Sequence, residues 1–156
     1  MGRTLDWLKR ITSSDSRRSA RTSGSGSVTV LAVSVPDTEY FRVEQVASSA
    51  GWESKFARTC EEAERLLEHR QFSVILLDRD LADIDWRTAI EHLKKSAPTS
   101  CILLISGIND EYLWREVIQR GGFDIISKPL SQDQLQAQID HAWFFWKSDL
   151  SRQAAD

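Results

Sequence analysis

Residues 72–85 read FSVILLDRDLADID, and this segment is the clearest guide to the fold. Its first half is apolar apart from Ser73, which is typical of a strand buried on both faces of a parallel sheet. The run stops at Asp78, and three more acids follow within the next seven residues. In α/β proteins with parallel sheets, the carboxyl ends of the strands form the edge where ligands bind. The segment therefore predicts a buried strand that presents Asp78 at a functional edge.

The same alternation of apolar runs and helical patterns continues on both sides of this segment. Strands are predicted at residues 28–35, 52–57, 72–77, 101–105 and 123–127. Helices are predicted over residues 37–49, from residue 59, and over residues 85–96, 110–120 and 131–148. Five strands alternating with five helices predict an α/β fold, a doubly wound five-stranded parallel sheet covered on both faces.

Capping residues mark the ends of two of these helices. Asp37 or Thr38 is predicted to cap the first helix, and Gly51 to close it. Thr59, with Glu62 three residues on, has the pattern of a capping box at the start of the second.

Charge is distributed unevenly along the 156 residues, which are 41% hydrophobic, 28% charged and −3 in net charge. Residues 1–26 carry six basic and two acidic side chains, so the remainder has a net charge of −7. An acidic globular part does not suit nucleic acid, whose phosphates attract basic surfaces. We expect no nucleic-acid-binding domain, and membrane contact only through residues 1–26.

Three parts are expected along the chain: a flexible basic leader and linker at 1–27, a domain at 28–148 and a tail at 149–156. The leader's short apolar pattern leaves open a docking helix or an unstructured segment. No apolar run reaches the roughly 18 residues that span a bilayer. Cys60 and Cys101 lie in no metal or redox spacing, which suggests a cytoplasmic protein.

Polar residues stand where the predicted strands end: Ser34 after the first, Asp78 after the third, Ser106 after the fourth and Lys128 after the fifth. A carboxylate can act as a nucleophile, while a hydroxyl and an ammonium can contact phosphoryl oxygens. This set predicts a phosphoryl-transfer centre. The alternative is that strand ends carry polar residues for solvation alone.

Four segments together resemble the receiver domain of two-component response regulators. Residues 76–85, LLDRDLADID, are similar to the phospho-acceptor segment LLD-x-x-L-P-D-x-D-G. Residues 61–63, 105–107 and 121–130 (GGFDIISKPL) resemble three other family segments in the same order. The resemblance covers about residues 28–146 and implies a flavodoxin-like receiver fold.

The resemblance also implies roles for individual residues. Asp78 would be the phospho-acceptor and Lys128 its lysine partner, with Ser106 contacting the phosphoryl group and Gly107 leaving room for access. Pro129 would follow a cis peptide bond. Implied partners are a histidine kinase, a phosphotransfer protein or a downstream effector in a phosphorelay.

The first strand departs from the family pattern. Receivers usually end this strand with two acids that hold Mg²⁺ together with the acceptor, and here Ser34 and Val35 stand there. Magnesium prefers oxygen ligands, which leaves Asp78, with Asp80 as a candidate substitute. We expect weak or absent Mg²⁺ binding and impaired phosphorylation. The alternative is a fully active receiver phosphorylated on Asp78.

Two further positions differ. The family glycine after D-x-D is Trp86, whose indole could cover the crevice, and the aromatic switch position is Ile125. Together they suggest a pseudo-receiver that is constitutive or gated by a partner. A flavodoxin-like cofactor protein is a third hypothesis, but residues 35–37 lack the hydroxyl-rich phosphate loop that it requires.

Four consecutive aromatics lie in the last predicted helix: Trp143, Phe144, Phe145 and Trp146. Consecutive helical positions point around the axis, so at least one should be exposed or cover a partner. With Trp114 on the preceding helix, they suggest a homodimer through the last two helices; packing within the core is the alternative. No enzyme output domain is expected, so the predicted function is regulation by protein contact.

Overall fold

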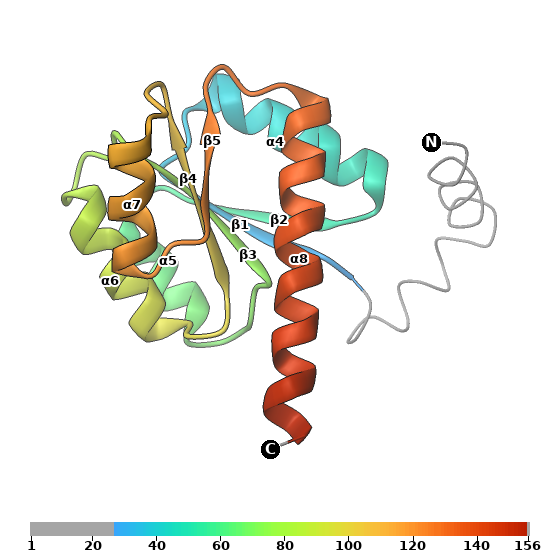
Figure 1. Ribbon diagram of the computed structural model, residues 1–156. Helices are drawn as coiled ribbons and strands as arrows, with labels where there is room; N and C mark the ends of the chain where they lie inside the picture. The colour runs from blue at the N-terminus through green and yellow to red at the C-terminus, as the bar shows by residue number, and fades with distance from the viewer. Residues whose placement is uncertain (1–26, 156) are drawn as a thin grey trace.

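The computed structural model describes residues 27–155. The predicted leader, apart from residue 27, therefore lies outside the described part of the chain, as does its short apolar segment. The elements, labelled as in Figure 1, are β1 (Thr29–Val33), α4 (Asp37–Ala50), β2 (Glu53–Ala57), α5 (Cys60–Leu67), β3 (Val74–Asp78), α6 (Trp86–Ser96), β4 (Cys101–Ser106), α7 (Glu111–Arg120), β5 (Asp124–Ser127) and α8 (Gln132–Ala155).

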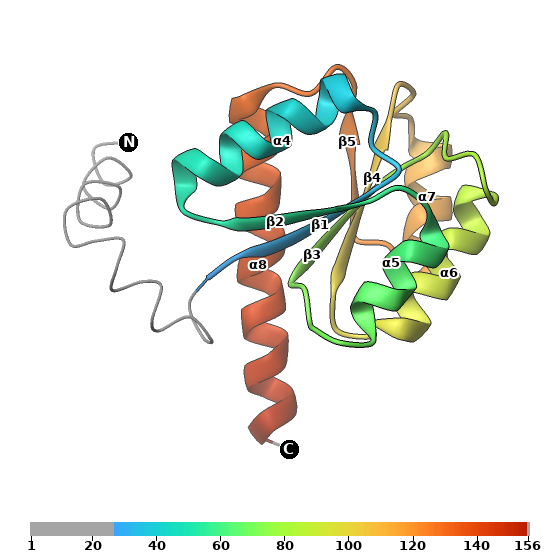
Figure 2. The same ribbon diagram turned by 180° about the vertical axis from the view of Figure 1, so that it is seen from behind.

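All five strands form one parallel sheet in the order β2-β1-β3-β4-β5. Helices α4 and α8 cover one face, and α5, α6 and α7 cover the other (Figures 1 and 2). The predicted doubly wound fold is confirmed. Because the strand order reverses between β1 and β3, the carboxyl ends of these two strands border the position where ligands bind in such sheets.

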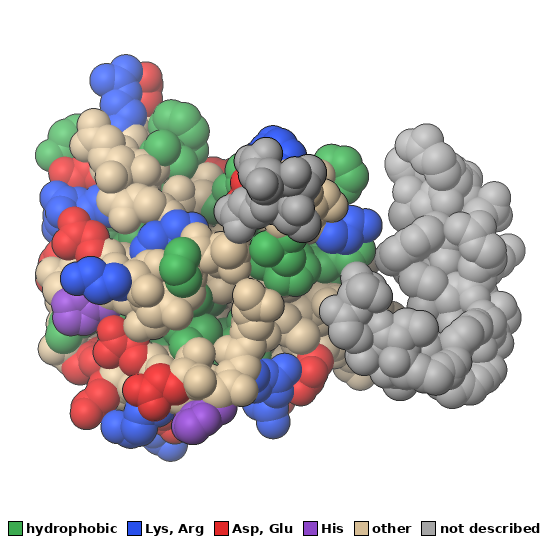
Figure 3. Space-filling view, turned by 90° about the horizontal axis from the view of Figure 1, so that it is seen from below, with side chains coloured by type: hydrophobic (Ala, Val, Ile, Leu, Met, Phe, Trp, Pro, Cys, Tyr) green, Lys and Arg blue, Asp and Glu red, His purple; other side chains and the backbone are tan. Residues whose placement is uncertain are grey.

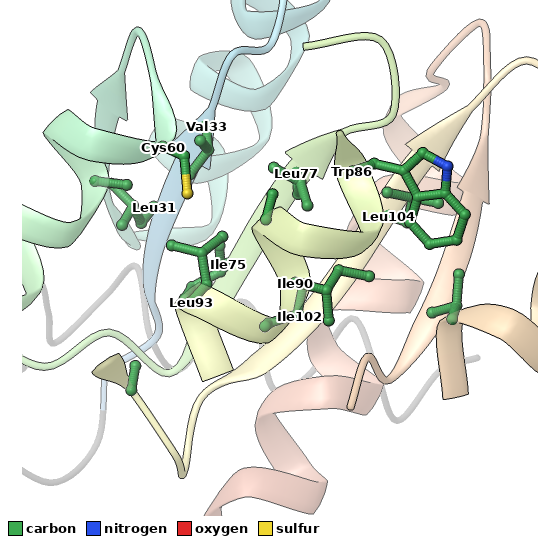
Figure 4. Close-up of a cluster of buried hydrophobic side chains, with 14 of the residues drawn as sticks. Leu31, Val33, Cys60, Ile75, Leu77, Trp86, Ile90, Leu93, Ile102 and Leu104 are labelled. Atoms are coloured by element: carbon green, nitrogen blue, oxygen red, sulfur yellow. The ribbon is translucent and has the colours of Figure 1, made fainter. Parts of the chain in front are cut away.

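Two apolar cores lie on the two faces of the sheet. Every residue of β3 and β4 is buried, as their uninterrupted apolar runs predict. Figure 4 shows the core under α5, α6 and α7, where strand side chains such as Ile75 and Leu104 meet Ile90 and Leu93 of α6. The second core lies under α4 and α8 and contains Val30, Leu76 and Leu103.

The start of α4 corrects a predicted cap. Pro36 is the N-cap and no side chain caps the helix, because Asp37 is already its first residue. The Asp37 carboxylate in the first turn still suits the positive end of the helix dipole. At the other end Gly51 closes the helix in the left-handed region, with φ 77°, as predicted.

The predicted capping box of α5 is present in altered form. Thr59 Oγ1 accepts a hydrogen bond from the Glu62 N–H at 3.1 Å, as expected for the N-cap. The Glu62 carboxylate, however, accepts from the Arg58 N–H at 2.7 Å and not from Thr59. The reciprocal bond therefore closes one residue earlier than in the standard motif.

Helix α8 is longer than predicted. It continues past the expected end at residue 148 to Ala155, so the predicted tail is helical through that residue. The reason lies in the sequence, since residues 131–156 contain neither glycine nor proline to stop the helix. Its lower part extends beyond the sheet (Figure 1). None of the helices within residues 27–155 is long and apolar enough to cross a membrane.

Candidate functional site

Asp78 ends the central strand β3 and is almost completely buried, with 1% of its surface exposed. Its Oδ1 accepts a hydrogen bond from the Asp80 N–H at 2.8 Å. Its Oδ2 lies 2.8 Å from Lys128 Nζ. A buried carboxylate needs such partners, because an isolated charge is costly to remove from water. The structure thus brings the predicted acceptor and the predicted lysine together.

Lys128 reaches this position from the end of the edge strand β5. Its backbone N–H donates to the Ser106 carbonyl at 2.9 Å, and the peptide bond to Pro129 is cis, as the resemblance implied. The ammonium also lies 3.7 Å from Asp80 Oδ2, although the Asp80 side chain is 73% exposed. Lys128 therefore faces two carboxylates, one buried and one open to solvent.

Ser106 ends β4 and is fully buried. Its Oγ accepts from the Ile108 N–H at 3.0 Å, which ties the hydroxyl to its own loop. Between them, Gly107 has open space where a Cβ would lie, as expected for an accessible loop. Sequence reasoning missed Asn109, whose Nδ2 donates to Ser127 Oγ at 2.9 Å beside the site. Asn109 is a polar loop residue outside any recognised motif, so the sequence did not indicate this contact.

The end of β1 presents no acid to Asp78. Val33 pairs with Leu77, so Ser34 is level with Asp78 on the neighbouring strand. Ser34 adopts φ 59°, and its Oγ donates to the Arg58 carbonyl at 2.9 Å.

Val35, the second departure at this strand end, is 1% exposed and packs in the core under α4 and α8. Within the described residues, no group of three or more His, Cys, Asp or Glu side chains is placed to hold a metal ion.

Trp86 does not cover the crevice, which corrects the sequence-based expectation. It is the first residue of α6, only 4% exposed, and belongs to the core under α5, α6 and α7 (Figure 4). The indole turns inward because α6 packs its apolar face on the sheet. Ile125, at the family's aromatic position, is 2% exposed in the same core.

The aromatic residues of α8 divide between core and surface. Trp143 and Trp146 are partly buried against the core under α8, whereas Phe144 is 63% and Phe145 45% exposed. On α7, Trp114 is 44% exposed. Packing within the core, the alternative to an interface, therefore applies to the two tryptophans of α8. The exposed Trp114, Phe144 and Phe145 remain candidates for an interface.

Phe145 does not stand alone on this side of the molecule. Its ring lies 5.1 Å from that of Phe123, measured between centroids, and His141 lies 5.5 Å from Phe123. Such spacings suit aromatic pairs. The exposed side of α8 therefore continues onto the residue that precedes β5.

Both cysteines are free and buried. Burial raises the pKa of the Cys60 thiol to about 12 and that of Cys101 to about 11. The nearby carboxylates of Glu64 and Asp83 contribute to the raised pKa of Cys60, after burial. The thiolate is the reactive form, so both side chains behave as small hydrophobic groups at neutral pH.

On the side of the molecule where the strands begin, the charged side chains do not form a patch of one sign. Acidic, basic and histidine side chains alternate there with hydrophobic ones (Figure 3). A phosphate backbone requires a basic stripe or patch. The described side chains on this face therefore form no single basic patch (Figure 3).

A doubly wound sheet with a buried aspartate on its central strand, a lysine from the edge strand and a buried serine between them defines a receiver-type signalling domain. The family model of the response regulator receiver domain matches residues 37–140. The chain therefore belongs to the response regulator receiver family. The match begins after β1, the strand that lacks the acids.

Solved structures agree with this fold. The signal receiver domain of an HD domain-containing protein from Pseudomonas fluorescens is 23% identical, with a TM-score of 0.73, over 81% of this chain and 93% of that one. NtrX from Brucella abortus is 25% identical, with a TM-score of 0.74, over 84% of this chain and 29% of its own. The beryllofluoride-activated NtrC4 receiver domain dimer is 27% identical, with a TM-score of 0.66, over 76% and 98%. Among curated proteins none matches the chain.

Proposed function

We propose that this receiver regulates a partner by protein contact and that Mg²⁺-dependent phosphorylation of Asp78 is impaired. The observation that carries the proposal is the end of β1, where Ser34 bonds to a backbone carbonyl and Val35 is buried in the core. In the family these positions hold the acid pair for magnesium. Neither side chain here offers a carboxylate.

The remaining oxygens do not fit a magnesium site of the family's kind. Magnesium takes octahedral oxygen ligands, usually with one or two carboxylates and several waters. The carboxylates at Asp78 are its own and that of Asp80, and Lys128 Nζ lies 2.8 and 3.7 Å from them. The ammonium offsets only one of these two negative charges, but it lies against the oxygens that a metal ion would have to use.

The loss of the ion would act directly on the rate of phosphoryl transfer. A bound magnesium ion supplies charge that neutralises the transferring phosphoryl group. Without it, a dianionic donor approaches Asp78 with only side-chain cations, Lys128 and the neighbouring Arg79, available to offset repulsion. Two unit charges about 4 Å apart near a protein surface interact by about 4 kcal/mol, which corresponds to about three orders of magnitude in rate.

A second candidate function is a fully active receiver phosphorylated on Asp78 by a histidine kinase or a phosphotransfer protein. The specific observation in its favour is the intact set of Asp78, Lys128 and Ser106, with the lysine 2.8 Å from the acceptor carboxylate. This candidate requires Asp80 to act as a metal ligand in place of the missing acids.

Intact mass after incubation with acetyl phosphate, with Mg²⁺ or with EDTA, separates the two candidates. We expect little phosphoryl adduct on the wild-type protein in either condition. Ser34→Asp should increase the adduct only with Mg²⁺, because residue 34 is level with Asp78 and an acid there restores one ligand. Asp78→Asn should abolish any adduct. Complete phosphorylation of the wild type that EDTA prevents would favour the active receiver and contradict our proposal.

For the partner surface we propose α7, β5 and α8, and a second copy of this chain as one partner. Support comes from the exposed Trp114, Phe144 and Phe145, and from the similarity to a receiver that forms a dimer. Large exposed apolar patches mark interfaces. The signal would then pass by contact, without catalysis of its own, in the cytoplasm that the free cysteines suggest.

Sedimentation equilibrium tests this surface. Phe145→Glu should weaken self-association, because it places a charge in the proposed interface. Phe41→Glu is the matched control, since Phe41 is 59% exposed on α4 and outside the proposed surface. A wild-type protein that stays monomeric at high concentration, or equal effects of the two substitutions, would contradict the dimer.

A further inference from the structure

One side chain joins the segment after Asp78 to helix α7. Arg87 Nε lies 2.7 Å from Glu116 Oε1, and the two side chains are 36% and 19% exposed. The Arg87 guanidinium also stacks on the Trp86 ring, 4.6 Å from its centroid. A short, partly buried charge-assisted bond with stacking is stronger than an ordinary surface pair. Arg87 therefore connects α6 and α7 with a defined geometry.

Arg87 and Glu116 each make a further hydrogen bond, Arg87 to the phospho-acceptor segment and Glu116 to an exposed residue of α7. On one side Asp85, the last acid of the acceptor segment, caps α6 by accepting from the Arg87 N–H at 3.0 Å. On the other side Tyr112 Oη donates to Glu116 Oε2 at 3.4 Å, and Tyr112 is 71% exposed. These hydrogen bonds therefore connect the phospho-acceptor segment with the exposed side of α7.

A second ion pair between the same helices provides a comparison. Arg120 lies 2.8 Å from Glu91, but it sits at the last residue of α7, and its partner lies further along α6 from the acceptor segment than Arg87. This pair therefore holds the two helices together without contacting the acceptor segment.

We propose that Arg87, stacked on Trp86 and bonded to Glu116, couples residues 79–85 of the phospho-acceptor segment to the position of α7. Ile125 lacks a ring and is buried, so it cannot carry a change of the site to the surface in the way that an aromatic residue could. Arg87 is a positioning residue, and the coupling is an energetic link between two regions. The inference rests on Asp78 being the regulated site but not on whether Asp78 is phosphorylated.

Replacing Asp78 by asparagine perturbs the site without phosphate or magnesium, and NMR of tryptophan indole N–H groups reads the response. Trp114 reports on α7, and its resonance is assigned with Trp114→Phe. We expect Asp78→Asn to shift the Trp114 resonance in the wild-type background. In an Arg87→Met background the shift should fall toward zero.

The matched control is Arg120→Met, which removes an ion pair between the same helices and should leave the Trp114 shift as in the wild type. If Arg87→Met fails to fold, Glu116→Gln provides a second variant that weakens the same contact, and it should also reduce the Trp114 shift. No Trp114 shift in the wild type, or an equal shift in all backgrounds, would overturn the inference. The phosphodonor experiment measures mass at Asp78, so either idea can fail alone.

Discussion

Replacing Lys128 by methionine should destabilise the fold, because it leaves the buried Asp78 carboxylate without its cation. The ammonium lies 2.8 Å from a residue that is 1% exposed. Removing one partner of a buried ion pair costs about 3–5 kcal/mol. Here the Lys128 side chain is 21% exposed and the Asp80 N–H still donates to the carboxylate. We therefore expect a smaller loss of unfolding free energy, about 2–3 kcal/mol, since water screens the pair in part.

Urea unfolding followed by tryptophan fluorescence measures this loss. With a dependence of about 1–3 kcal/mol per molar urea, the midpoint should fall by about 0.7–3 M. Lys95→Met is the control, an exposed lysine on the same protein that should change stability by less than about 0.5 kcal/mol. The double variant Asp78→Asn/Lys128→Met should recover most of the loss, because a neutral amide needs no cation. An unchanged midpoint for Lys128→Met, or a double variant as unstable as the single one, would refute the reasoning.

Three further outcomes are expected. Asp110→Ala removes the side-chain cap of α7 and should lower the unfolding free energy by about 1 kcal/mol, seen as a lower melting temperature by circular dichroism. Gly122→Ala should destabilise because its Cβ would lie 2.5 Å from a valine methyl, whereas Gly107→Ala, with nothing within 4 Å, should be tolerated; equal melting temperatures would contradict this. Burial raises the pKa of Cys60 to about 12 and that of Cys101 to about 11, above the ordinary 9.0. The contribution of these two thiols to the unfolding free energy should therefore be constant below about pH 9 and fall as pH rises toward those values. Iodoacetamide should accordingly label neither thiol at about pH 8 without urea.

Much of the fold could be predicted because β3 and β4 are buried on both faces and therefore read as continuous apolar runs. Their ends were correct to within one or two residues. The end of α8 was predicted at residue 148, seven residues too early, because the sequence there has no glycine or proline to mark where the helix ends. The first-turn acid at Asp37 suggested a cap, but the helix begins one residue earlier than a capping role allows.

The site could be predicted only for the reactive side chains at the ends of strands. Asp78 and Lys128 meet because parallel strands deliver their carboxyl ends to one edge. The direction of a side chain at the start of a helix was not predictable, and Trp86 turned into the core. The contact between Arg87 and Glu116 joins residues 29 positions apart and depends on helix packing, which no local pattern encodes.

Both lateral edges of the sheet are built to resist extension by another strand. The β5 edge is only four residues long, and Gln138 Nε2 donates to the Ile125 carbonyl at 3.0 Å, which occupies an acceptor that an incoming strand would need. The β2 edge carries Glu53 and Lys55, charges that disfavour pairing with a flat apolar strand. Unprotected edges are the usual starting points of amyloid-like aggregation. Association beside β5 must therefore proceed through side chains, and a continuous intermolecular sheet is disfavoured on either flank.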